Sequence, residues 1–256
     1  MAVHYETDGP VAVVTLDRPA VANAIDRPTA DELVAALRRF EADGSPSVAV
    51  LTGAGGKFCA GADLKAMREE GAPRANRVAA DGDGPVGPTR MLLGKPVIAA
   101  VEGHAVAGGL ELAVWCDLRV AAEDAVFGVF CRRWGIPLMD GGTIRLTRLL
   151  GHSHALDLIL TGRGVSGQEA LQMGLANRLV PPGQALPAAL ELARDLAARP
   201  QAALRSDRLS SYEQWSMSLD DALTREYEHG MATLQTGELF GGLEEYASGD
   251  WRTDAA

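Results

Sequence analysis

Short apolar runs alternate with glycine-containing turns over the first two-thirds of the chain. Residues 3–6 and 11–16 flank the turn sequence DGP at 8–10, a pattern that predicts a β-hairpin. Further apolar runs of strand length predict strands at residues 47–52, 96–102, 118–121 and 125–130.

One stretch between these runs has the period of an amphipathic helix. Asp26 stands where it can cap the first turn, Leu33, Leu37 and Phe40 share one face, and Gly44 marks the end. Strands that alternate with a helix in this way predict an α/β core.

The last third of the chain changes to a helical pattern with Gly, Pro or Ser between segments. We predict an α/β core over residues 1–195 and a helical region over 196–256. The apolar side chains of these helices exceed what a few loosely attached helices can hide, which predicts packing between subunits. The predicted helices cover residues 155–161, 167–173, 185–198, 201–215 and 219–233, whereas 81–88 is a loop.

Composition excludes several classes of protein. The chain has 256 residues, 47% of them hydrophobic and 23% charged, which is typical of a globular protein. No apolar run approaches the roughly 20 residues that a membrane span needs, so we expect no membrane partner. A net charge of −10 without a basic stripe argues against nucleic acid as a partner. The start lacks the features of a secretory signal, so we expect a cytoplasmic protein with reduced cysteines.

Two strand-to-helix turns rich in small residues are the most informative feature. The strand at 48–52 leads through GAGGKFCAGAD, and the strand at 97–101 leads through EGHAVAGG. Backbone N–H groups at such turns can face a ligand with the positive end of a helix dipole behind them. Two turns that converge would form an oxyanion hole for a carbonyl group, although each alone could be only a tight turn. Neither matches a phosphate-binding motif, GxGxxG or GxxxxGK[ST].

Four motifs in this order resemble the crotonase, or enoyl-CoA hydratase/isomerase, superfamily. They are RPxxxNAI at 18–25, FCAGADL at 58–64, KPVIAAVEGHAVAGGLELAVWCD at 95–117 and GGTIRL at 141–146. The resemblance implies a crotonase-type spiral of ββα repeats with a C-terminal helical oligomerisation region. It also implies a homotrimer or a dimer of trimers.

The resemblance carries over binding residues one by one. It assigns the oxyanion hole to the backbone N–H groups of Ala62 and Gly108, in agreement with the two turns described above. No metal, nicotinamide or flavin is implied, and coenzyme A enters as part of an acyl-CoA thioester substrate. Lys57 could equally be a solvated surface lysine. The candidate contacts to coenzyme A are Ala20, Val21, Lys57, Ala60, Asp63 and Leu64.

Glu111 is the first catalytic candidate because it interrupts the apolar run GGLELAVW. Burial would raise its pKa into the useful range for acid–base chemistry, and the resemblance matches it to the first of two hydratase glutamates. A buried salt bridge to Arg119 is the structural alternative. The second glutamate falls on Cys131, where a thiol is a poor substitute and is more simply a small buried hydrophobe.

Asp140 is the second catalytic candidate. Some crotonase relatives carry a working aspartate at about this place, so Asp140 could act as acid, base or nucleophile opposite Glu111. Alternatively, Asp140 caps the helix that begins at Gly141 or Gly142. His104 could line the pocket, and the loop 74–90 resembles the region that covers the acyl chain in relatives.

Taken together, these features predict an enzyme of the enoyl-CoA hydratase type, which adds water to a 2-enoyl-CoA or removes it. The substitution of the second acid leaves two alternatives open. One is an isomerase or hydrolase that uses Asp140 with Glu111. The other is an acyl-CoA-binding member without catalysis.

Overall fold

The structure, a computed structural model, describes residues 1–68 and 73–249. The chain forms two compact units, Met1–Arg194 and Asp195–Ala256. All strands of the described residues belong to the first unit, whereas the second is helical. The α/β fold is therefore confirmed. The functional roles that the sequence assigns to residues 1–195 and 196–256 stay predictions.

A six-stranded sheet forms the centre of the first unit. Its order is β1-β2-β3-β4-β6-β9, and only the β1–β2 hairpin is antiparallel. Every residue of β4 is buried, as expected for a parallel strand covered on both faces. The strands are β1 (Val3–Asp8), β2 (Val11–Leu16), β3 (Val48–Gly53), β4 (Val97–Val101), β6 (Leu118–Ala122) and β9 (Arg178–Val180).

A small second sheet joins the turn before α3 to later parts of the chain. It consists of β5 (His104–Val106), β7 (Val126–Gly128) and β8 (Gly164–Ser166) in that order. The predicted strand 125–130 is therefore shorter than expected. β5, β8 and β9 were not predicted, because three-residue strands are too short to show a period of two.

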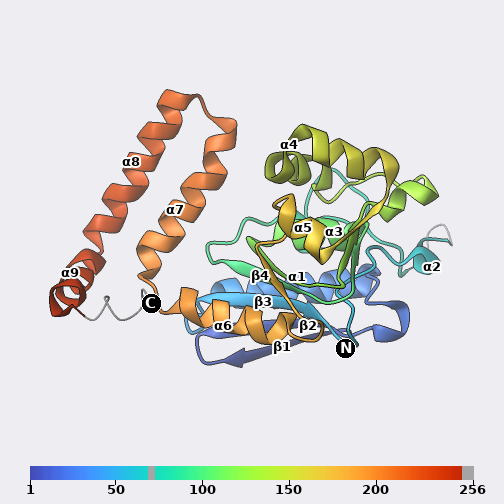
Figure 1. Cartoon of the computed structure of the whole chain (residues 1–256), viewed down its shortest axis with the longest axis horizontal. Helices are drawn as coiled ribbons and strands as arrows, with labels where there is room; N and C mark the ends of the chain where they lie inside the picture. Colours follow the sequence, from blue (N-terminus) through green and yellow to red (C-terminus); the bar gives the residue numbers. More distant parts are fainter. Residues whose placement is uncertain (69–72, 250–256) are drawn as a thin grey trace. The chain divides into compact units, whose positions relative to one another are not determined.

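Helices cover the large sheet in the first unit, and α3, α4 and α5 lie together above it in Figure 1. Asp26 caps α1 as predicted, accepting a hydrogen bond from Thr29 N. The predicted helix 155–161 is the end of a longer α4, whose backbone breaks at Gly151 with φ 72°. The helices are α1 (Arg27–Ala42), α2 (Leu64–Met67), α3 (Gly108–Trp115), α4 (Gly142–Thr161), α5 (Gly167–Gln172) and α6 (Ala185–Ala197).

The second unit contains α7 (Gln201–Glu213), α8 (Leu219–Gln235) and α9 (Glu238–Ser248), the last of which was not predicted. α7 and α8 form an antiparallel hairpin, visible in orange in Figure 1. The Glu213 carboxylate joins them by accepting from Arg225 and His229.

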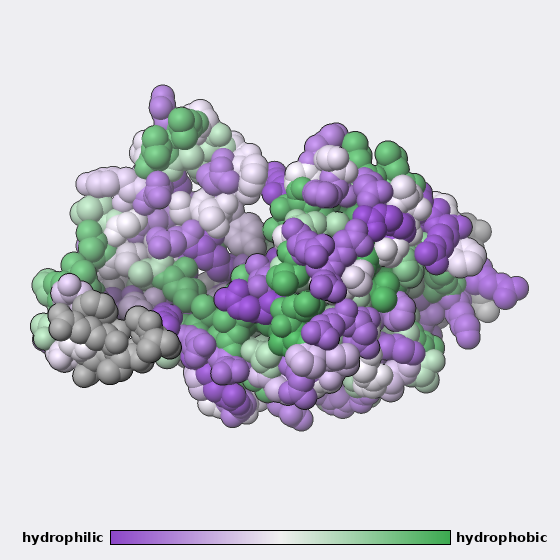
Figure 2. All heavy atoms as spheres, in the orientation of Figure 1, coloured by the Kyte–Doolittle hydropathy of each residue, from purple (hydrophilic) through white to green (hydrophobic). Residues whose placement is uncertain are grey.

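One face of α8 carries exposed apolar side chains at intervals of three or four residues, which is the spacing of a single helix face. Figure 2 shows apolar patches along this unit. Within the described residues, no helix is long and apolar enough to span a membrane. The exposed apolar residues of α8 are Leu219, Leu223, Tyr227, Met231 and Leu234.

Candidate active site

The two glycine-rich turns predicted from the sequence meet in the first unit. Two backbone hydrogen bonds join the turns: Cys59 N donates to His104 O (2.8 Å), and Val106 N donates to Cys59 O (3.0 Å). A Cβ built on Gly61 would lie 2.7 Å from the Gly108 nitrogen, and one built on Gly108 would lie 3.5 Å from the Ala62 nitrogen. The turns are therefore in direct contact, with their backbone amides side by side.

The amides of Ala62 and Gly108 are available for a ligand. Gly108 is the first residue of α3, where the helix offers its N–H no acceptor. Among the backbone hydrogen bonds of the described residues, none uses either N–H as a donor. Both residues line the same pocket. This is the arrangement expected of paired donors for a carbonyl oxygen.

The turn before α3 has a strained backbone conformation, which a hydrogen bond and close packing hold in place. Ala107 has φ 52° and ψ −125°, a conformation that costs a residue with a side chain about 1–3 kcal/mol. Its N–H donates to Gly128 O at 2.8 Å. A Cβ on Gly109 would lie 2.1 Å from the carbonyl oxygen of Cys59, so only glycine fits there.

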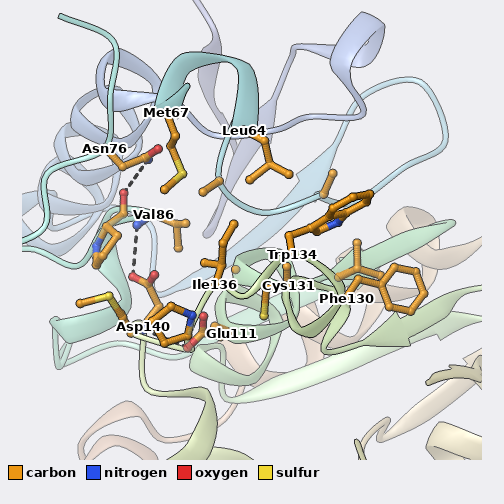
Figure 3. A pocket seen from close by; sticks show the side chains of 18 of the residues that line it. Leu64, Met67, Asn76, Val86, Glu111, Phe130, Cys131, Trp134, Ile136 and Asp140 are labelled. Atoms are coloured by element: carbon orange, nitrogen blue, oxygen red, sulfur yellow. Dashed lines mark hydrogen bonds between the residues drawn. The ribbon is translucent and has the colours of Figure 1, made fainter. Parts of the chain in front are cut away.

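A cavity of about 220 Å³ opens at these amides, and most of its wall is apolar. Figure 3 shows Glu111, Asp140 and Cys131 on one side and Leu64 and Met67 on the other. The lining residues are Ala60, Ala62, Leu64, Met67, Asn76, Val78, Pro85, Val86, Val106, Ala107, Gly108, Glu111, Phe130, Cys131, Trp134, Ile136, Pro137, Met139 and Asp140.

Glu111 lies on the first turn of α3 and is only 3% exposed. Its Oε1 accepts hydrogen bonds from the backbone N–H groups of Asp140 (2.9 Å) and Gly142 (2.8 Å). No hydrogen bond among the described residues uses Oε2, so this oxygen is left for a ligand. Burial, with a smaller contribution from the charge of Asp140, raises the pKa of Glu111 to about 7.

The alternative role for Glu111, a salt bridge to Arg119, is wrong. Arg119 is buried, but its guanidinium donates to the carbonyl oxygens of Cys116 and Leu175 and to the side chain of Asn177. Carbonyl oxygens at the ends of nearby elements therefore accept hydrogen bonds from the Arg119 guanidinium. Within the described residues, no ion pair joins Arg119 to Glu111.

Asp140 is buried at 4% exposure, and its side chain does not cap α4. The N-cap residue of α4 is Gly141, which has a φ of 88°, and no side chain caps the helix. Instead, Asp140 Oδ1 accepts from Val86 N (3.1 Å) and the Thr89 hydroxyl (2.5 Å). Burial is the largest influence on Asp140 and raises its pKa. The pocket therefore contains two buried carboxyl groups.

Cys131 is buried in the 3₁₀ helix η3 (Phe130–Trp134) and lines the same pocket. Burial first, and then the nearby charge of Glu111, raise the pKa of its thiol. A thiol with a raised pKa stays protonated and is a weak nucleophile. The structure thus places Cys131 beside Glu111, as the alignment of motifs predicts, but in a form that cannot replace a carboxylate.

The predicted contacts to coenzyme A divide into two groups. Ala60 and Leu64 line the pocket, whereas Lys57 is exposed outside it. Asp63 caps α2 and pairs with Arg18 at 2.9 Å. Their contacts to coenzyme A stay predictions, as do those of the exposed Ala20 and the partly exposed Val21.

His104, which the sequence left as one possible pocket residue, is not among the residues that line the pocket. It is exposed on β5, because its side chain points to the opposite side from the buried Ala105.

Sequence reasoning missed the residues that hold the two carboxyl groups. Thr89 and Val86 bind Asp140, and Arg145 donates to the carbonyl oxygens of Asp140 (2.9 Å) and Thr89 (2.6 Å). Gly142 is required because a Cβ there would lie 2.9 Å from Glu111 Oε1. In the sequence, the GG pair of GGTIRL at 141–142 was the one sign that the backbone approaches another group closely here.

Comparison with known proteins identifies the family. The family model for enoyl-CoA hydratase/isomerase matches residues 6–248. The chain therefore belongs to the enoyl-CoA hydratase/isomerase family of enzymes, and the crotonase resemblance seen in the four motifs is confirmed.

Relatives and solved structures agree with this assignment over most of the chain. Enoyl-CoA hydratase EchA19 of Mycobacterium tuberculosis is 37% identical over 249 residues, which cover 94% of this chain and 92% of that protein. A carnitinyl-CoA dehydratase of Proteus mirabilis is 41% identical over 198 residues, 77% of this chain and 74% of that protein. The crystal structure of enoyl-CoA hydratase EchA1 from Mycobacterium marinum superposes with a TM-score of 0.90 at 35% identity and covers 96% of both chains.

The raised pKa of Glu111 predicts how the free energy of unfolding depends on pH. Because its pKa is raised from the ordinary 4.5 to about 7, the folded state holds the proton more tightly than the unfolded state. Stability is therefore lost as pH rises from 4.5 to 7, and this loss amounts to about 3 kcal/mol at pH 8. Glu111→Gln removes the ionisation, so its stability relative to the parent should rise between pH 5 and pH 8. Urea denaturation at both pH values measures this, and an equal difference at the two pH values would contradict it.

Proposed function

We propose that this chain adds water to a 2-enoyl-CoA, or removes it from the 3-hydroxyacyl-CoA, at the pocket that contains Glu111. The observation that carries the proposal is the position of two unpaired backbone amides and a buried carboxyl group with a pKa of about 7 around one apolar cavity. The names of the relatives, enoyl-CoA hydratase and carnitinyl-CoA dehydratase, support the same type of reaction.

The chemistry follows from these groups. The amides of Ala62 and Gly108 would bind the thioester oxygen and stabilise the negative charge that develops when the double bond is attacked, an effect worth about 3–4 kcal/mol per donor. Glu111 Oε1 is held by two N–H groups, which fix the carboxylate while Oε2 binds and deprotonates water. The hydroxide adds to Cβ of the substrate, and Cα then takes up a proton, either the one that Glu111 removed from water or one from a second acid nearby.

Addition of water transfers no electrons to the protein, so the proposed reaction needs acid–base groups and a polarised carbonyl alone. Coenzyme A would enter as part of the substrate, and we propose no separate cofactor. The adjacent turn, with Ala60 and Leu64 on the pocket wall, is the side from which the thioester would enter.

The hydratase proposal is tested by the ultraviolet absorbance of the conjugated thioester in trans-2-enoyl-CoAs. We expect the absorbance to fall with the parent protein and the rate to drop by at least about 100-fold in Glu111→Gln, the range of general acid–base catalysis. Because the base must be ionised, kcat/KM should fall as pH decreases through about 7. Unchanged rates in Glu111→Gln would contradict the role of this residue, whereas binding of acyl-CoA without turnover would favour a binding protein.

A second reaction type is favoured by the burial of Asp140. With Cys131 at the position of the second family glutamate, Asp140 is the other carboxyl group in the pocket, and its raised pKa suits a proton donor. Glu111 and Asp140 together could instead transfer a proton between two carbons, as in an isomerase, or assist hydrolysis.

Asp140→Asn separates these possibilities. It retains an oxygen that can accept from Val86 N and Thr89, so the loop should stay in place. We expect turnover to fall about 10- to 100-fold if Asp140 donates the proton, with Glu111 chemistry otherwise intact. Mass spectrometry of the products distinguishes hydration, isomerisation and hydrolysis. Full activity in Asp140→Asn would show that the residue only holds the loop.

We further propose that the exposed apolar face of α8 packs against other copies of the chain in a trimer or a dimer of trimers. Light scattering after size exclusion should give three or six times 26.9 kDa. Leu223→Glu places a charge on this face and should reduce the mass, whereas Thr224→Glu adds the same charge one position along and should have a smaller effect. A monomer in the parent protein would exclude this proposal.

A further inference from the structure

Large apolar side chains surround the mouth of the pocket and remain exposed to solvent. They contrast with Glu111 and Asp140, which line the same pocket and are only 3% and 4% exposed. Contiguous exposed apolar surface next to a binding pocket indicates a surface that a ligand covers. The exposed members of this rim are Leu64, Met67, Val78, Trp134 and Met139, with exposed fractions between 37% and 68%.

Trp134 is the largest of these side chains and is 68% exposed, although the element that carries it is firmly held. In η3, Cys131 is buried and Arg132 Nε donates to Ile159 O of α4 at 3.0 Å, which attaches the element to the core. An aromatic side chain on an anchored element loses little freedom on binding, which makes it an effective contact for an apolar ligand.

We propose that this rim binds an apolar acyl group longer than four carbons, with its distal part against Trp134. The inference rests on the proposed function, because the thioester carbonyl at Ala62 and Gly108 fixes where the acyl group begins. From there the chain would continue along an apolar wall toward the exposed rim. Figure 3 shows Trp134 between Leu64 and Cys131.

The chemistry of the wall favours the acyl group over the nucleotide end of coenzyme A. Of the described residues that line the pocket, none is a lysine or an arginine, and the two carboxyl groups would repel phosphates. A four-carbon acyl group would leave most of the rim in water. Each additional methylene that is covered improves binding by about three- to fourfold.

The test compares crotonyl-CoA with trans-2-octenoyl-CoA. We expect kcat/KM to be higher for the octenoyl substrate, and Trp134→Ala to lower this preference by about tenfold through loss of apolar contact area. Leu160→Ala is the matched control, because Leu160 is equally exposed at 68% in the same unit but does not line the pocket. It should leave the preference as in the parent protein.

A binding measurement separates this inference from the proposed reaction. Calorimetry with the saturated thioesters butyryl-CoA and octanoyl-CoA needs no turnover, and octanoyl-CoA should bind more tightly in a manner that depends on Trp134.

If this holds while no enoyl-CoA is hydrated, the proposed function fails and the acyl preference stands. If crotonyl-CoA is hydrated but Trp134→Ala leaves the ratio of the two substrates unchanged, the acyl preference fails and the hydratase stands. An equal loss of affinity for free coenzyme A in Trp134→Ala would place the indole on the cofactor portion instead and overturn the inference.

Discussion

The hydrogen bonds from the amides of Asp140 and Gly142 to one oxygen of Glu111 are the interaction on which the site depends. They join the first turn of α3 to the start of α4, through residues that lie 29 and 31 positions after Glu111 in the chain. They also compensate in part for the burial of a carboxyl group that forms no ion pair with a described residue. Because the compensation is partial, the pKa remains raised, and a residue that is costly to bury becomes useful for proton transfer.

Backbone geometry provides the remaining parts of the site. Two parallel strands, β3 and β4, end at the same edge of the sheet, so the turns that follow them are brought together. Small residues at Gly61, Gly108 and Gly109 allow the turns to approach closely enough for their amides to share one ligand. The strained Ala107 shows that this approach is held by surrounding contacts. The proposed polarising site is made of backbone and does not depend on side-chain chemistry, and so it is compatible with several reactions.

Side chains at the pocket then decide which reaction is possible. A protonated thiol at Cys131 cannot bind and deprotonate water as a carboxylate does, and Glu111 and Asp140 are the two carboxyl groups that line the pocket. The two carboxyl groups are held by different segments, one through α3 and the other through the loop that contains Val86 and Thr89.

The sequence by itself determined the α/β core, the family, the two turns and the burial of Glu111, because these depend on local patterns and on motifs read in order. It could not determine the partners of Asp140, since Thr89 and Val86 lie 51 and 54 residues away and carry no pattern of their own. For the same reason it left open a helix cap at Asp140 and a salt bridge between Glu111 and Arg119, beside the catalytic roles of the two carboxyl groups. Only the tertiary structure decided between local and distant partners, because burial removes water and each polar group must then bind whatever donor or acceptor the fold places beside it.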